Sequence, residues 1–193
     1  MSRIFCIVGK SASGKDTIYK KIIKTYFSNL IPIIPYTTRP KRVGEINGVD
    51  YNFVNEEQLL SLEKEGKVIE KRQYSTTQGI WCYFTFKFEI EKKNDYILIT
   101  TLDGAAKIME EYGSDLVHLV YLVLDDKIRL LRCIERESKQ ENPDYLEVCR
   151  RFIADQNDFS PSKISLFKNI HYINTNLNIE KCIEKWNEIY ERG

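Results

Sequence analysis

The fold is decided by a short stretch near the start of the chain, Gly9-Lys10-Ser11-Ala12-Ser13-Gly14-Lys15. An apolar run over residues 4–8 comes directly before it and reads as a fully buried parallel strand. Apolar residues at helical spacing follow it, so the G-x-x-x-x-G-K pattern stands where a phosphate-binding loop should, between a strand and a helix. Glycine at both ends allows the backbone to fold around an anion with its N–H groups pointing inward. These residues predict a site for a nucleoside triphosphate.

The loop also indicates where charge is placed. Lys15 supplies a positive charge for the terminal phosphates, and the helix that starts near Asp16 turns its positive end toward the same anion. A Ser or Thr that ligates Mg²⁺ is expected after the lysine, but this chain has Asp16 there, followed by Thr17. We expect Asp16 or Thr17 to hold the metal, directly or through water, although an acid is also common in a first helical turn. The expected phosphate-binding residues are Gly9, Ser11, Ala12, Ser13, Gly14, Lys15, Asp16 and Thr17.

Composition limits the classes of function. A chain of 193 residues forms one substantial core and is too short for two full domains with linkers. A net charge of +1 gives no overall field that favours nucleic acid. Five scattered cysteines without a C-x-x-C pair are typical of reduced thiols, and the longest apolar stretch, residues 116–124, is half the length of a membrane span. We expect a cytoplasmic protein without a signal peptide that binds neither nucleic acid nor membranes.

Strand and helix patterns alternate along most of the chain. Buried strands are predicted over residues 4–8, 96–101 and 116–124, and a short last strand over 171–173. Helices are predicted from residue 16 and over 105–112, 126–137, 145–159 and 178–192. This alternation predicts a parallel sheet with helices on both faces, a three-layer α/β/α fold. Residues 30–35 are short and contain proline, so they read either as an edge strand or as an entry loop.

Residues 36–93 interrupt this alternation. Asn55 and Gln58 predict a capping box at the start of a helix that Gly66 ends. Strands are predicted over residues 50–54, 67–74 and 81–88. Because this segment is inserted just after the first strand–helix unit, we expect a small antiparallel subdomain that covers the phosphate loop as a flap.

A second motif makes the functional prediction specific. Residues 37–45 read Thr-Thr-Arg-Pro-Lys-Arg-Val-Gly-Glu, and residues 48–54 read Gly-Val-Asp-Tyr-Asn-Phe-Val. Together with the phosphate loop, they resemble the guanylate kinase family, which shows T-T-R-x-x-R-x-G-E and G-x-D-Y-x-F-V at this distance. The resemblance covers nearly the whole chain and is strongest up to Val54 and around Glu70. It implies a P-loop fold with a mostly parallel sheet in the core (about 1–35, 94–126 and 155–193), a β-rich insert that binds the nucleoside monophosphate (about 36–93) and a helical lid (about 127–154).

The resemblance implies that Arg39, Arg42 and Tyr51 bind the phosphate of the acceptor. The two arginines are three residues apart, and two guanidinium groups can hold one phosphate through paired hydrogen bonds. Without the family pattern, the same basic run reads equally well as a solvated loop.

Glu70 matches the glutamate with which the family reads the base, although it also fits an exposed strand position. A carboxylate accepts from the N1–H and the amine of guanine, whereas adenine leaves it partly unpaired, at a cost of about 1–3 kcal/mol. Tyr83 and Thr85 are the candidates for the family's tyrosine and hydroxyl in this region, across an apparent insertion. The base site also departs from the family pattern at Pro35, which replaces a polar donor, and at Thr101, which replaces a second base-reading acid.

The family's lid arginines match Arg132, Arg136 and Arg151, which implies that they stabilise charge on the transferring phosphoryl group. Ordinary salt bridges on a helix surface are the alternative reading. Asn174, after the last strand, is a candidate near the adenine. An aspartate that helps the family to organise Mg²⁺ is aligned with Ile99, so we expect Mg²⁺ to be held differently in this chain.

These expectations combine into one reaction, in which an ATP-dependent kinase of purine metabolism phosphorylates GMP or dGMP with Mg²⁺ as cofactor. The expected catalytic residues are Lys15, Arg39, Arg132, Arg136 and Arg151. The expected acceptor-binding residues are Arg39, Arg42, Tyr51, Glu70, Tyr83, Thr85 and Thr101. Two alternatives stay open: a kinase for another nucleotide or a phosphorylated sugar, and a non-catalytic peptide-binding module of guanylate-kinase-like type. We expect a monomer or a homodimer.

Overall fold

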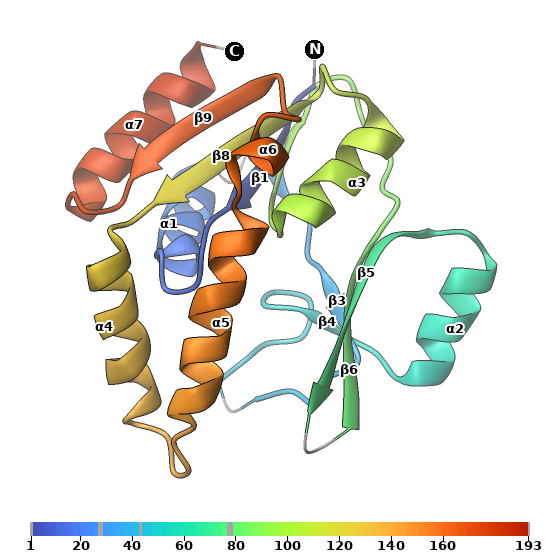
Figure 1. Cartoon of the computed structure of the whole chain (residues 1–193). Coiled ribbons are helices and arrows are strands. Elements are labelled where there is room, and N and C mark those ends of the chain that lie inside the picture. The colour runs from blue at the N-terminus through green and yellow to red at the C-terminus, as the bar shows by residue number, and fades with distance from the viewer. Residues whose placement is uncertain (1, 27–28, 43, 77–78, 193) are drawn as a thin grey trace.

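The computed structural model describes residues 2–26, 29–42, 44–76 and 79–192, and a five-stranded sheet forms its centre. In sheet order the strands are β2 (Leu30–Pro32), β7 (Asp95–Ile99), β1 (Ile4–Val8), β8 (Val117–Val123) and β9 (Asn169–Asn174) (Figure 1). All neighbouring strands are parallel, and every residue of β1 is fully buried. The predicted parallel sheet is confirmed, with residues 30–32 as an edge strand rather than an entry loop.

Helices cover both faces of this sheet. α1 (Lys15–Tyr26) and α7 (Ile179–Glu191) pack on one face, where Ile22 and Trp186 are fully buried against apolar strand residues. α3 (Leu102–Tyr112) packs on the other face, and Ile164 of the short α6 (Pro161–Ile164) contacts the same apolar cluster. Burial of these opposed faces confirms the three-layer α/β/α fold.

A second, smaller sheet projects from this core (Figure 1). Its strands lie in the order β4 (Asn52–Phe53), β3 (Tyr36–Thr37), β6 (Gly79–Phe86) and β5 (Val68–Thr76). The prediction of a purely antiparallel subdomain was wrong, because β3 and β4 are parallel and the sheet is therefore mixed. The long loop between these two strands returns the chain to the start of β3 before β4 begins, so both strands run the same way.

The small sheet has its own apolar core and one helix, α2 (Glu56–Lys64). The helix begins with the predicted capping box, in which Asn55 Oδ1 accepts from the Gln58 N–H at 2.8 Å and Gln58 Oε1 accepts from the Asn55 N–H at 2.9 Å. Leu59 of the helix is buried with Phe84 of β6. This packing lies on the face of β6 opposite Tyr83 and Thr85, which belong to the polar site described below.

Several element boundaries differ from the sequence prediction. β7 ends at Ile99 rather than at residue 101, because Thr101 is the N-cap of α3 and its Oγ1 accepts from the Gly104 N–H at 3.1 Å. β9 is longer than predicted, because it pairs with β8 from Asn169 to Asn174. The short helix α6 was not predicted.

Two further helices, α4 (Asp126–Glu137) and α5 (Tyr145–Asp158), pack against each other beside the phosphate loop (Figure 1). Both match their predicted positions closely. Among the helices of the described residues, none is long and apolar enough to cross a membrane.

Candidate nucleotide-binding site

The phosphate loop adopts the backbone that its glycines predict. Gly14 has a φ of 91° and Ala12 a φ of 61°, so the loop uses left-handed conformations just before α1 begins at Lys15. Gly9 meets a different requirement, because a Cβ at this position would lie 2.6 Å from Ser13 Oγ and 2.9 Å from Leu122 O. Two glycines are therefore needed, one for conformation and one for close packing.

Two side chains of this region, Lys15 and Ser13, turn toward the loop. Lys15 Nζ donates to Gly9 O at 2.6 Å and to Lys10 O at 3.1 Å, so the ammonium group closes over the loop. Burial lowers the pKa of Lys15, and the negative charges of Asp16 and Asp155 partly oppose that shift. The buried Ser13 Oγ has no hydrogen-bond partner among the described residues, which leaves a donor available to a phosphate oxygen.

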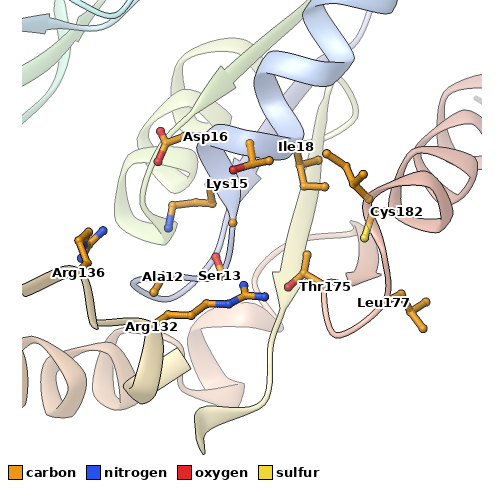
Figure 2. Close-up of a pocket in the computed structure, with 13 residues that line it drawn as sticks. Ala12, Ser13, Lys15, Asp16, Ile18, Arg132, Arg136, Thr175, Leu177 and Cys182 are labelled. Carbon is orange, nitrogen blue, oxygen red and sulfur yellow. The ribbon is translucent and has the colours of Figure 1, made fainter. Parts of the chain in front are cut away.

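A cavity of about 490 Å³ opens at this loop, a size typical of small-molecule sites. Figure 2 shows the residues that line it, from the loop, from α4 and from the region after β9. Arg132 and Arg136 line it from α4, and Thr175 and Leu177 line it from the segment between β9 and α7. Asn174, expected near the adenine, is not among the lining residues, because its Oδ1 accepts from Asn176 in its own turn.

The three predicted lid arginines gather around the loop. Arg136 also lines a smaller pocket that contains Ser11 and Arg151. Within the described residues, the side chains of Arg132, Arg136 and Arg151 form no hydrogen bond or ion pair. The neighbouring Arg150, in contrast, donates to both oxygens of Glu147, at 2.6 Å and 2.7 Å. Arg150 thus forms the surface salt bridge that was the alternative for this region, whereas Arg132, Arg136 and Arg151 keep their donors available for an anion.

Arg129 and Asp155 were missed by sequence reasoning. Arg129 is fully buried, and its Nη1 donates at 2.7 Å to Asp155 Oδ2, which also accepts from the backbone N–H of Ser11 at 2.9 Å. The guanidinium group lies 4.2 Å from the ring centre of Phe152. This pair joins α4 and α5 to the phosphate loop. The sequence held one sign of this pair: Arg129 lies four residues before Cys133 and therefore on the same buried side of α4, where a charged residue is unusual.

The residues proposed for Mg²⁺ lie at the first turn of α1. Asp16 and Thr17 are exposed and line the cavity. In the described residues there is no cluster of three or more His, Cys, Asp or Glu side chains suited to a metal. Mg²⁺ is commonly held by one or two carboxylates together with substrate phosphates and water, so a single carboxylate beside a phosphate loop fits this ion.

Arg39 occupies the centre of the candidate acceptor-phosphate site. Its Nη1 and Nη2 donate to the two Glu45 oxygens at 2.9 Å and 2.7 Å, and its Nε donates to the Tyr83 hydroxyl at 3.1 Å. The guanidinium group also lies 5.4 Å from the ring centre of Tyr51. The hydrogen bonds to Glu45 raise the pKa of Arg39, and burial is the main cause of the raised pKa of Tyr51. The Tyr51 hydroxyl therefore stays protonated and can donate a hydrogen bond to a phosphate oxygen.

Arg42 lies on the same loop as Arg39 but does not share its contacts in this structure. Its side chain is exposed, and only its backbone N–H reaches Glu45, at 2.8 Å from Oε2. Glu45 therefore fixes the loop and orients Arg39 with one carboxylate. The expectation that Arg42 binds the acceptor phosphate together with Arg39 stays a prediction.

The candidate base site lies at the other end of the same sheet face. The Glu70 side chain is only 4% exposed, and its Oε1 accepts from Thr85 Oγ1 at 3.0 Å. A Cβ on Gly104 would lie 2.2 Å from Thr100 Oγ1, 3.3 Å from Thr101 Oγ1 and 3.5 Å from Glu70 Cδ, so these groups surround one glycine. The structure thus brings Glu70, Thr85 and Thr101 together, and it adds Thr100, whose buried Oγ1 has no hydrogen-bond partner in the described part of the chain.

Known proteins resemble this chain in sequence and in fold. A family model described as guanylate kinase matches residues 1–142. The chain belongs to the guanylate kinase family. A guanylate kinase of Mycoplasma genitalium is 27% identical over 191 residues, covering 97% of this chain and 74% of that protein. A guanylate kinase of Malacoplasma penetrans is 29% identical over 161 residues, covering 81% of this chain and 82% of that protein.

A solved structure shows the same fold. The crystal structure of guanylate kinase from Anaplasma phagocytophilum superimposes with a TM-score of 0.69 and 20% identity, covering 99% of this chain and 85% of that one. The departures from the guanylate kinase pattern can be placed on this fold. Pro35 only offers its carbonyl oxygen, which accepts from the Asn52 N–H at 2.9 Å, and Thr101 stands beside Glu70 as a helix cap.

Proposed function

We propose that the chain catalyses ATP-dependent phosphorylation of GMP or dGMP, yielding ADP and GDP or dGDP. The observation that carries the substrate assignment is the buried Glu70 carboxylate, which accepts from Thr85 Oγ1 and lies with Thr101 close around Gly104. A buried carboxylate and adjacent hydroxyl groups complement the N–H and carbonyl groups of guanine.

The residues of this chain favour phosphoryl transfer by position and charge. The acceptor phosphate is already anionic near neutral pH, so the reaction needs no general base. Arg39 and Tyr51 would hold this phosphate, while Lys15 and the backbone of the loop would hold the donor phosphates. Arg132, Arg136 and Arg151 would neutralise charge on the phosphoryl group in transit.

Asp16 and Thr17 are proposed to hold Mg²⁺, which would supply positive charge beside the donor phosphates. Residues of about 36–93 and 127–154 are proposed to close over the substrates. Closure would exclude water, which would otherwise accept the phosphoryl group. We also propose a cytoplasmic monomer or homodimer, which light scattering of the purified chain would distinguish.

The substrate assignment is tested by a coupled assay of ADP release across the common nucleoside monophosphates and phosphorylated sugars. We expect turnover with GMP and dGMP, and we expect Glu70→Gln to lower kcat/KM for GMP by roughly tenfold or more because one acceptor becomes a donor. The KM for ATP should stay unchanged. Turnover of another acceptor in the absence of GMP turnover would contradict the assignment.

A kinase for a different acceptor is the second candidate. Pro35 and Thr101 favour it, because both remove groups with which the family contacts guanine. The same acceptor panel decides between the two candidates. A non-catalytic peptide-binding module is disfavoured, because Lys15, Arg132 and Arg136 line one cavity and Arg151 lines a small pocket that shares Arg136 with it.

A further inference from the structure

The Arg72 side chain contacts the Glu70 carboxylate, the group proposed to recognise the base. Nothing in the proposed reaction requires an arginine at this position. It lies two residues after Glu70 on β5, and alternate residues of a strand share one face. Its Nε donates to Glu70 Oε2 at 3.0 Å, and its Nη2 lies 3.2 Å from Glu70 Oε1. Both oxygens of the base-reading carboxylate are therefore engaged by a guanidinium group.

The hydrogen-bond capacity of Glu70 is nearly used up by these contacts. An ionised carboxylate offers about four acceptor positions, two on each oxygen. Oε1 accepts from both Thr85 and Arg72, and Oε2 accepts from Arg72. One position remains, on Oε2. Guanine presents two donors on one edge, the N1–H and the exocyclic amine, and it needs one position on each oxygen.

We propose that Arg72 is a latch on Glu70, defined by these two hydrogen bonds, which guanine must replace with its own N–H donors to bind. This inference rests on the proposed GMP kinase function and names a residue that sets acceptor affinity. Burying an unpaired charge is costly, so in the empty site the Arg72 guanidinium stabilises the buried Glu70 carboxylate. Removing Arg72 should therefore strengthen acceptor binding.

The surroundings permit the exchange. The Arg72 side chain is 26% exposed, against 4% for Glu70, so the guanidinium group can move toward solvent while the carboxylate stays fixed. Arg72 is opposite Tyr83 in the strand register, which places it between the base end and the phosphate end of the site.

The test measures nucleotide binding by calorimetry with the full chain and no ATP. Arg72→Met keeps the length of the side chain and removes its donors. We expect GMP to bind roughly two- to fivefold more tightly, the range for loss of a competing, partly exposed ion pair. IMP lacks the exocyclic amine and can use the single free position on Oε2, so its affinity should change less than twofold.

A double-mutant cycle isolates the latch. In a Glu70→Gln background, Arg72→Met should bring no gain for GMP, because an amide does not hold the guanidinium group as a carboxylate does. Lys71→Met is the matched control, since Lys71 points to the other face of β5 and pairs with Glu63. It should leave GMP affinity unchanged, and thermal melting should show that all variants are folded.

Each other outcome overturns the latch. Unchanged or weaker GMP binding by Arg72→Met would mean that Arg72 does not compete with guanine, or that it contacts the bound nucleotide. Equal gains for GMP and IMP would mean that Arg72 obstructs the site by bulk rather than by occupying Glu70. Failure of the proposed function has a different signature, because the unmodified chain would then not bind GMP.

Discussion

The donor end and the acceptor end of this site are prepared in different ways. At the donor end the phosphate loop is contiguous in sequence, and Ser13 Oγ, Arg132 and Arg136 keep donors available toward one cavity. At the acceptor end the charged groups pair with each other, Arg39 with Glu45 and Glu70 with Arg72. The donor end is thus built to receive an anion directly. The acceptor end must exchange internal partners for those of its ligand, a property that favours selectivity over affinity.

The largest effect on catalysis is expected from a substitution at the donor end. Lys15→Met removes the charge that faces the transferring phosphates, and kcat for GMP phosphorylation should fall by about 10³-fold. Because the acceptor end is separate, the affinity for GMP measured without ATP should stay within about twofold. A parallel loss of GMP affinity would show that the two ends are coupled already in the empty enzyme.

A smaller effect is expected where the donor end is held in shape. Asp155→Asn weakens the contact of Asp155 with the buried Arg129 and with the Ser11 N–H. We expect the KM for ATP to rise about tenfold and the free energy of unfolding to fall by about 2 kcal/mol, because the buried Arg129 guanidinium loses one of its two counter-charges and keeps Asp126, 3.0 Å from its Nη2. Steady-state kinetics and urea denaturation measure the two effects.

Asp158→Asn is the matched control for this change. Asp158 lies on the same helix, 60% exposed and 3.9 Å from Lys163, so its loss should leave both quantities nearly unchanged. Equal responses of the two variants would contradict the anchoring role of Asp155.

The smallest expected effect is on stability, and it comes from the five-stranded sheet that supports both ends of the site. Burial, and then the neighbouring His171, lower the pKa of His118 to about 4. The neutral ring is favoured by folding, so its contribution is fully present above pH 6.5 and is lost as the pH falls from 6.5 toward 4. The melting temperature of His118→Gln should therefore decline less over this range than that of the unmodified chain, by a few degrees. Identical slopes would contradict the assignment.

Local patterns made much of the molecule predictable. The apolar run before the loop, the capping box at Asn55 and the glycines of the loop each specify structure through neighbours a few residues away. The insert was predicted as antiparallel because its aromatic strands show no direction by themselves. The parallel pairing of β3 with β4 depends on the path of the intervening loop, which no local pattern encodes.

The candidate site divides in the same way. The sequence by itself determined the phosphate loop, the type of fold and the family, because the residues involved are contiguous or recur at fixed spacing. Only the tertiary structure decided that Arg39 is held by Glu45 while Arg42 is exposed, that Arg129 and Asp155 anchor the loop, and that Arg72 covers Glu70. Charged side chains are long and choose partners by distance and burial, and these quantities exist only once the strands and helices are packed.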